Sequence, residues 1–164
     1  MLSSIFTWRP HKDSRDRPKA LAVSSGGGHW VQLRRVAPAF KEFELIFVTV
    51  NPAYRGEAAP HRFYAINDAT RWNKFKLMAM VVRIFLILWR ERPDVVISTG
   101  AAPGFFALRL GHLMGARTIW IDSIANVEAM SMSGQKIGPH ADLWLTQWPH
   151  LASPDGPKFV GQVL

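Results

Sequence analysis

The sequence contains no cysteine in its 164 residues. This absence excludes a disulfide framework, a thiolate nucleophile and any zinc or iron–sulfur site that depends on cysteine ligands, and it fits a reducing compartment. Acidic residues are also few, because 12 Asp and Glu stand against 20 Lys and Arg, and the formal net charge is +8. The basic excess predicts an anionic partner: nucleic acid, an anionic membrane surface or a phosphorylated substrate.

Long hydrophobic runs are missing as well. The longest apolar stretch, residues 77–89, has thirteen residues and is interrupted by Arg83, whereas a spanning helix needs about 20. Residues 1–19 form a basic N-terminal segment whose apolar part is too short for the core of a signal peptide. We expect this segment to be a frayed terminus or to contact a membrane through Ile5, Phe6 and Trp8.

The length predicts a single domain, which we expect over residues 20–164. Several apolar runs are consecutive rather than alternating, as in Val95, Val96 and Ile97, which is typical of strands covered on both faces. Helical segments at 30–40 and 104–114 separate such runs, so the pattern predicts an α/β fold with a mainly parallel sheet. The expected strands are residues 20–24, 45–50, 62–66, 94–99, 118–122, 142–146 and 158–160.

The apolar segment near residues 72–91 carries cations at a regular interval. Lys76, Arg83 and Arg90 are spaced by seven and therefore share one stripe of a helix. A basic stripe beside a wide apolar face predicts a helix at a membrane interface, although a core helix with one stripe in water has the same pattern. The residues expected to face the membrane are Trp72, Lys76, Arg83, Phe85, Trp89 and Arg90.

A glycine-rich loop lies between the first expected strand and the following helix. It contains Ser25, Gly26, Gly27, Gly28 and His29. Its backbone can turn tightly and present N–H groups to a phosphate or diphosphate at the helix N-terminus, and His29 can act as a general base or bind phosphate. The dinucleotide fingerprint and the P-loop motif are both absent, and a simple strand-to-helix turn is the alternative.

Two further polar segments follow strands of the same sheet. One is the loop of Gly100, Ala101, Ala102, Pro103 and Gly104, and the other contains Asp122 and Ser123. In a parallel sheet the carboxyl ends of the strands share one edge, so we expect these segments to face the ligand of the glycine loop. The alternative role for Asp122 or Ser123 is to cap the next helix. Absence of an Asp-x-Asp pair, a His-Glu helix pair and a nucleophile elbow argues against metal-dependent sugar-nucleotide transferases, zinc hydrolases and serine hydrolases.

Several motifs together resemble one known family. Their order over residues 20–164 resembles that of the membrane-associated, acceptor-side subunit of the two-subunit UDP-sugar transferase of lipid-linked oligosaccharide synthesis. Bacterial relatives of that subunit serve exopolysaccharide and capsule pathways. The motifs are Ser25 to His29, Pro93 to Gly100, Ile121 to Val127, Met130 to Lys136, Ala141-Asp142, Thr146 to Pro149 and Phe159 to Gly161.

The resemblance implies a Rossmann-like domain equivalent to the N-terminal, acceptor half of a two-domain GT-B glycosyltransferase. It implies an inverting transfer from a UDP-sugar, held by a separate donor-binding catalytic subunit, to a polyprenyl-diphosphate-linked sugar. It also implies an enzyme subunit that is inactive alone, with no cofactor and no metal, on the cytoplasmic face of the bacterial inner membrane.

Roles for individual residues follow from the same resemblance. His29 and Asp122 are the base candidates, and the two glycine-containing loops with Ser123 and Asn126 bind phosphate or acceptor. The chain departs from the family at Asp122, where Glu is usual, at Asn126, where Arg is usual, and in the loop 100–104, where a Gly-Pro-Gly-Thr-like sequence is usual. The expected contacts with the partner subunit are Ser131, Ser133, Gly134, Lys136, Gln147, Trp148 and Pro149.

Two other classes of function compete with this interpretation. One is a membrane scaffold protein without a chemical role, which the basic apolar helix alone would serve. The other is a basic nucleic-acid-binding domain. The second is disfavoured because the cations follow an apolar helix instead of alternating with stacking aromatic residues.

Overall fold

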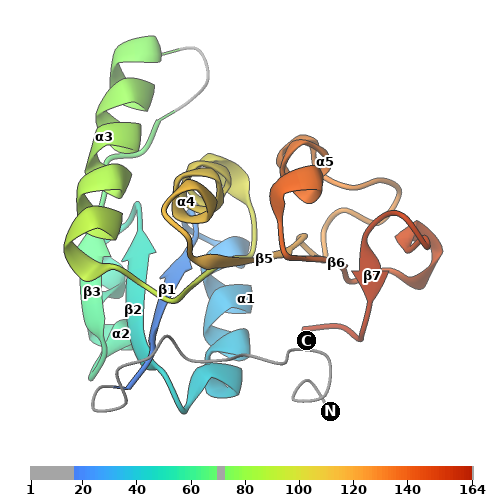
Figure 1. Cartoon of the computed structure of the whole chain (residues 1–164), viewed down its shortest axis with the longest axis horizontal. Helices are drawn as coiled ribbons and strands as arrows, with labels where there is room; N and C mark the ends of the chain where they lie inside the picture. Colours follow the sequence, from blue (N-terminus) through green and yellow to red (C-terminus); the bar gives the residue numbers. More distant parts are fainter. Residues whose placement is uncertain (1–16, 70–72, 164) are drawn as a thin grey trace.

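The computed structural model describes residues 17–69 and 73–163, and in this part the chain forms an α/β domain around one parallel sheet (Figure 1). The sheet has seven strands in the order β3-β2-β1-β4-β5-β6-β7, and every neighbouring pair is parallel. The expected α/β Rossmann-like fold is therefore confirmed. The strands are β1 (Lys19–Val23), β2 (Glu44–Thr49), β3 (Arg62–Ala65), β4 (Val95–Ser98), β5 (Arg117–Ile121), β6 (Leu143–Thr146) and β7 (Lys158–Phe159).

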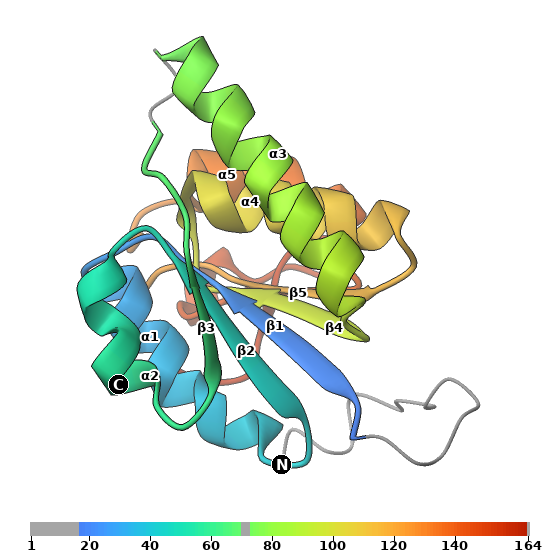
Figure 2. The same ribbon diagram turned by 90° about the vertical axis from the view of Figure 1, so that its left-hand side faces the viewer.

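Helices cover both faces of the sheet, with α1 and α2 on one side and α3, α4 and α5 on the other (Figure 2). The α-helices are α1 (Gly28–Val36), α2 (Arg55–Ala58), α3 (Lys74–Glu91), α4 (Ala101–Leu113) and α5 (Met132–Ile137). Short 3₁₀ helices are η2 (Ala37–Phe40), η3 (Pro52–Tyr54), η4 (Gly138–His140) and η5 (Pro149–Leu151). Of the predicted basic segment 1–19, residues 1–16 lie outside the described part of the chain.

The core consists of two apolar layers separated by the sheet. Val95 and Ile97 of β4 point into the layer that contains Trp30 of α1. Their neighbour Val96 points into the opposite layer, which contains Leu88 of α3. Because successive strand side chains alternate between faces, a consecutive apolar run is required wherever both faces are covered. This accounts for the sequence pattern that predicted the strands.

The strand order reverses direction at β1, which pairs with β2 on one side and β4 on the other. The connection after β1 leads to α1, and the connection after β4 leads to α4 on the opposite face. Ligands of open parallel sheets bind at such a switch point, outside the carboxyl ends of the strands. The glycine loop and the predicted loop 98–104 therefore meet there, although residues 101–104 of the latter form the first turn of α4 and only Thr99 and Gly100 connect it to β4.

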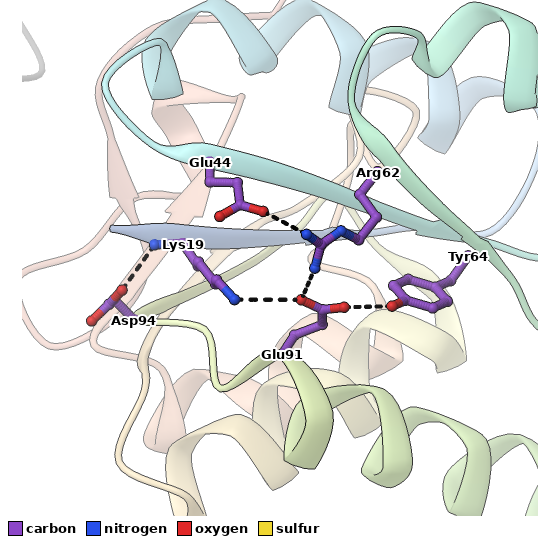
Figure 3. A network of polar contacts seen from close by, with 6 residues as sticks. All are labelled: Lys19, Glu44, Arg62, Tyr64, Glu91 and Asp94. Carbon is purple, nitrogen blue, oxygen red and sulfur yellow. Dashed lines mark hydrogen bonds and ion pairs between the residues drawn. The ribbon is translucent and has the colours of Figure 1, made fainter. Parts of the chain in front are cut away.

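At the opposite, N-terminal edge of the sheet, a polar network holds the last turn of α3 (Figure 3). The carboxylate of Glu91, whose side chain is 1% exposed, accepts hydrogen bonds from Arg62 and Tyr64 and lies 3.6 Å from the Lys19 ammonium group. Arg62 also contacts Glu44, with 3.0 Å between Nη2 and Oε1. A buried charge is tolerated only when it is paired in this way, so the network fixes where α3 ends against the sheet.

Candidate functional site

His29 lies at the switch point and is joined to the loop after β4 by two reciprocal hydrogen bonds. Its Nδ1 atom is 2.9 Å from the backbone oxygen of Thr99, and the Thr99 hydroxyl donates to the backbone oxygen of His29 at 2.7 Å. Gly100 packs against the imidazole so closely that a Cβ atom there would lie 2.5 Å from Cε1 of His29. The structure thus brings the two loops together at one edge of the sheet, as the sequence predicted, and shows in addition that His29 contacts the second loop.

The first turn of α1 presents backbone donors beside this histidine. Val31 is the first residue of the helix whose N–H bonds to a preceding carbonyl, that of Gly27, at 3.2 Å. The N–H groups of residues 28–30 have no acceptor among the described residues, as expected for a helix N-terminus. A Cβ on Gly28 would meet no atom within 4 Å. The backbone is therefore accessible at Gly28 and partly at His29, whereas Trp30 is 1% exposed, and the helix dipole favours an anion at the accessible positions.

One N–H group of the glycine loop is bonded to Tyr54, a residue that the sequence did not indicate. The N–H of Gly27 donates to the hydroxyl of Tyr54 at 3.1 Å, and the Tyr54 ring stacks on Trp30 with 4.9 Å between centroids. Of the three loop glycines, Gly27 does not offer its N–H to a ligand in this arrangement. Tyr54 contacts the loop from 27 residues away in sequence, so no local motif could have indicated it.

The second loop is more tightly packed than predicted. Pro103 and Gly104 are buried, and a Cβ on Gly104 would lie 1.8 Å from Oγ of Ser98. The N–H of Gly100 donates to the same Ser98 hydroxyl at 3.1 Å. The prediction that Gly100, Pro103 and Gly104 face a phosphate is wrong in this structure, because internal packing and hydrogen bonding account for them. Only Ala101 and Ala102 of the predicted loop are partly exposed.

Asp122 is the second base candidate, and its carboxylate is fully engaged within the chain. The residue is 2% exposed. Its two oxygens accept from the indole of Trp120 at 3.1 Å, the amide of Asn126 at 3.1 Å, and both the N–H and the hydroxyl of Ser131 at 2.7 and 2.5 Å. This arrangement shapes the turn between β5 and α5. The prediction that Asp122 serves as a base is contradicted by its burial, since a base must reach the proton that it removes.

Ser123 belongs to a buried amide network that ties this turn to α1. Gln32 donates to the Ser123 hydroxyl at 3.2 Å and accepts from the N–H of Ile124 at 3.1 Å and from Gln147 at 2.5 Å. Gln147 also donates to the backbone oxygen of Asp122 at 2.9 Å and accepts from the N–H of Val163 at 2.8 Å. Gln32 was not predicted, since its partners are distant in sequence. The network keeps Ser123 inside the chain, where it is not accessible to an acceptor.

The predicted contacts with a partner subunit divide into buried and exposed residues. Gln147 is 1% exposed, and Gly134 is buried beneath Asp122 and Ser131, so neither can touch a partner and the prediction is wrong for both. Ser131 caps α5, because its hydroxyl accepts from the N–H of Gly134 at 2.8 Å. The remaining predicted contacts are at least partly exposed: Ser133, Lys136, Trp148 and Pro149.

Helix α3 is apolar on two opposite faces. Met80, Ile84 and Leu88 are buried against the core. The outward face carries large apolar side chains at spacings of three and four, and Phe75 is 91% exposed and Trp89 60%. The outward set is Phe75, Met78, Val82, Phe85, Leu86 and Trp89. The helix is therefore both a core helix and a helix with an exposed apolar face, where the sequence left these two as alternatives.

The predicted cations of α3 are all exposed. Lys76, Arg83 and Arg90 lie on the flank between the two apolar faces, as the repeat of about 3.6 residues per turn requires. Trp72 lies outside the described residues. None of the helices described for this chain is long and apolar enough to cross a membrane.

Ionisable groups with shifted pKa values lie away from this site. Burial of Asp142 would raise its pKa, but hydrogen bonds from the backbone and hydroxyl of Thr118 and from Arg117 outweigh that effect, so the pKa is lowered. Burial and the neighbouring Glu91 carboxylate raise the pKa of Tyr64. Among residues 17–69 and 73–163, no group of three or more His, Asp and Glu side chains is arranged to hold a metal ion.

These features define a Rossmann-like α/β domain in which a histidine and an open helix N-terminus meet at the switch point of the sheet. The crystal structure of MurG from Acinetobacter baumannii has a related fold, with a TM-score of 0.70 and 15% identity over 88% of this chain and 46% of MurG. At this identity the likeness shows the fold alone, and the chain corresponds to about half of MurG.

The chain belongs to the family of Alg14-like oligosaccharide biosynthesis proteins, whose family model matches residues 61–163. The UDP-N-acetylglucosamine transferase subunit alg14 of Schizosaccharomyces pombe is 32% identical over 77 residues, which are 43% of this chain and 37% of that protein. The subunit of the same name from Yarrowia lipolytica is 33% identical over 72 residues, 40% of this chain and 33% of its own length. The chain thus spans about a third of these curated relatives.

Proposed function

We propose that the chain is the acceptor-binding subunit of an inverting glycosyltransferase that moves a sugar from a UDP-sugar to a polyprenyl-diphosphate-linked saccharide. The observation that carries the proposal is the pairing of the His29 imidazole with the unbonded, accessible N–H groups of Gly28 and His29 at the switch point. A base next to an anion-binding helix N-terminus suits an acceptor that has both a hydroxyl to be deprotonated and a diphosphate. The family membership and the relatives named as UDP-N-acetylglucosamine transferase subunits support the same reaction class.

In the proposed mechanism, Nε2 of His29 takes the proton from the acceptor hydroxyl as its oxygen attacks the anomeric carbon of the donor sugar. The bond to UDP breaks on the opposite side, and the configuration inverts. The N–H groups of Gly28 and His29 hold the acceptor diphosphate. The donor is bound by a second subunit in this proposal, which the names of the relatives as subunits of a UDP-N-acetylglucosamine transferase support.

We also propose that α3 places the subunit on an anionic membrane surface. Its outward face exposes six large apolar side chains, and Lys76, Arg83 and Arg90 flank them. An apolar face bordered by cations fits lipid tails and anionic headgroups together. A second copy of the chain fits less well, because a symmetric contact along this face would bring identical cations together.

The cellular setting is the final part of the proposal. We place the subunit peripherally on the cytoplasmic face of a bacterial inner membrane, in exopolysaccharide or capsule synthesis. The cysteine-free composition supports a reducing compartment. The choice of pathway rests on the resemblance of the motif order to the family, of which the relatives named above are from Schizosaccharomyces pombe and Yarrowia lipolytica.

Reconstitution with a donor-binding subunit tests the proposed function. The purified chain alone should give no transfer from a radiolabelled UDP-sugar to a polyprenyl-diphosphate-linked acceptor. Transfer should appear when the chain is co-purified with the UDP-sugar-binding protein encoded next to it. Robust transfer by the chain alone would contradict the half-enzyme proposal, and a stable complex without transfer would favour a scaffold.

A further inference from the structure

We propose that Thr99 and Gly100 are positioning residues that hold the imidazole of His29 as the Nδ1–H tautomer and leave Nε2 free as the proton acceptor. This inference deepens the proposed function, on which the catalytic use of His29 rests. It assigns a role to two residues that do not touch the acceptor themselves. It also explains why the loop after β4 is packed against α1.

The tautomer follows from the chemistry of the hydrogen-bond partner. Nδ1 of His29 lies 2.9 Å from the backbone oxygen of Thr99. A carbonyl oxygen can only accept, so Nδ1 must carry the proton in this contact. In the neutral imidazole the other nitrogen then has the free lone pair. No described residue donates to Nε2, which leaves that lone pair for a substrate hydroxyl.

The backbone of His29 is held by the same residue that holds its ring. The Thr99 hydroxyl donates to the backbone oxygen of His29 at 2.7 Å, so the ring and the main chain are both attached to one loop. Thr99 is 70 residues away in sequence and is completely buried. Two hydrogen bonds to a buried residue across the switch point restrain the position of the ring more than a single exposed hydrogen bond does.

Gly100 provides the space that the imidazole occupies. A Cβ there would lie 2.5 Å from Cε1 and 2.6 Å from Nδ1 of His29. Its φ of +133° is also in the region that favours glycine. Any side chain at this position would displace the ring from the Thr99 carbonyl. The glycine is thus required by the histidine as well as by the backbone.

The experiment measures the tautomer directly, by long-range ¹H–¹⁵N correlation NMR of the imidazoles in the purified chain at neutral pH. The chain has six histidines, and the signals of His29 are assigned by their loss in His29→Ala. In the wild type, we expect a protonated Nδ1 and an unprotonated Nε2. In Gly100→Ala, we expect the displaced ring to lose this tautomer and give a mixture of both forms.

Gly115→Ala is the matched control for strain. Gly115 has a positive φ of +87°, yet a Cβ there meets no atom within 4 Å. The control therefore introduces an alanine in a similar backbone region without contact to His29, and the His29 signals should stay as in the wild type. If Gly100→Ala does not fold, Thr99→Val and Thr99→Ser replace it. Valine keeps the carbonyl but removes the hydroxyl that holds the His29 main chain, so the ring should lie less firmly against the carbonyl and the tautomer bias should weaken. Serine retains the hydroxyl and should restore the bias.

A kinetic measurement separates this inference from the proposed function. In the enzyme assembled with its donor-binding subunit, Gly100→Ala should lower kcat by about 10²-fold, the effect of misplacing a reacting group by about 1 Å, with KM for the UDP-sugar unchanged. An Nε2–H tautomer in the wild type, or unchanged signals in folded Gly100→Ala and in Thr99→Val, would overturn the positioning role. Full activity of His29→Ala, together with the expected tautomer in the wild type, would instead contradict the catalytic role of His29.

Discussion

The two edges of the sheet handle polar groups in opposite ways. At the N-terminal edge, the charged groups are paired: both oxygens of Glu91 accept hydrogen bonds, and the Asp94 carboxylate accepts from the N–H of Lys19 at 2.8 Å (Figure 3). At the C-terminal edge, few side chains are charged, yet the N–H groups of residues 28–30 and Nε2 of His29 have no partner among the described residues. The N-terminal edge therefore has more charged side chains, whereas the C-terminal edge has the polar groups that are free to bind a ligand.

Helix α3 links these two edges. Its last turn is held by Glu91 at the N-terminal edge, and its first turns extend past the sheet on the side of the strand ends (Figure 1). A fixed C-terminal turn gives the exposed apolar face a defined direction relative to the site. The paired network thus sets the direction of α3, and the chemistry that we propose for His29 lies at the other, open edge.

The largest expected effect is at the open edge. In the assembled enzyme, His29→Ala should lower turnover by about 10²–10⁴-fold, the usual contribution of a general base. His61→Ala is the control, because His61 is exposed on the β3 side of the molecule and should leave turnover unchanged. Initial rates with a UDP-sugar and a lipid-linked acceptor give the measurement. Near-normal turnover of a folded His29→Ala variant would show that His29 is not the general base.

The second prediction concerns the exposed face of α3. Changing Lys76, Arg83 and Arg90 to Glu should weaken binding to vesicles with anionic lipid by at least about 100-fold, since each cation near such a surface contributes about 1 kcal/mol. The fold should persist, because all three side chains are exposed. Vesicle co-sedimentation gives the affinity, and circular dichroism reports folding.

A matched triple reversal controls for net charge. Arg35, Lys41 and Lys136 are exposed on other elements, and their change to Glu alters the total charge equally. This variant should retain most of the vesicle binding. Equal loss in both triple variants would show that net charge matters and the α3 face does not. Absence of binding by the wild type would contradict the membrane proposal altogether.

The third prediction is at the paired edge and concerns stability. Glu91→Gln should lower the free energy of unfolding by about 1–3 kcal/mol, because it weakens charged hydrogen bonds at a buried site while Lys19 and Arg62 remain partly solvated. Urea unfolding followed by circular dichroism measures the change. Glu128→Gln, at an exposed glutamate, is the control and should stay within about 0.5 kcal/mol. If Glu91→Gln lowered turnover without changing the free energy of unfolding, the paired edge would contribute to the reaction and the two edges would not differ in function.

The sequence was sufficient for the sheet and for the meeting of the two loops that form the candidate site. Consecutive apolar residues such as Val95, Val96 and Ile97 predicted two-sided burial, and the parallel arrangement then placed the loops after β1 and β4 at one edge. Both conclusions depend on local pattern and on general rules of topology. His29 was identified for the same reason, since it follows the glycines at the start of a helix.

The assignment of roles within the site was less predictable. Asp122 follows a strand and resembles a base in sequence, but its burial depends on Ser131 and Asn126, which only the folded turn brings to it. Gln147 lies in a motif that suggested a partner contact, yet its amide binds Gln32, 115 residues away. Hydrogen bonds between such distant residues decide whether a polar side chain is available, and no local pattern encodes them.

The smallest expected effect is the pH dependence that Tyr64 gives to the paired edge. Burial, the hydrogen bond to Glu91 and the negative charge of that carboxylate raise the pKa of Tyr64 above its usual value. A raised pKa in the folded state means that the stabilisation is complete below the unfolded value of about 10 and is lost as the pH rises through the folded pKa.

Tyr64→Phe should therefore reduce the loss of unfolding free energy between about pH 8 and pH 11, measured by urea unfolding at each pH. The same substitution in the Glu91→Gln background should have a smaller effect, because the carboxylate that shifts Tyr64 is gone, and the double-mutant cycle isolates this coupling. Turnover at neutral pH should not change in either background. If the free energy of unfolding of Tyr64→Phe falls with rising pH as steeply as that of the wild type, the hydroxyl does not take part in the polar network that holds α3. Glu91 would then hold the helix through Lys19 and Arg62 alone.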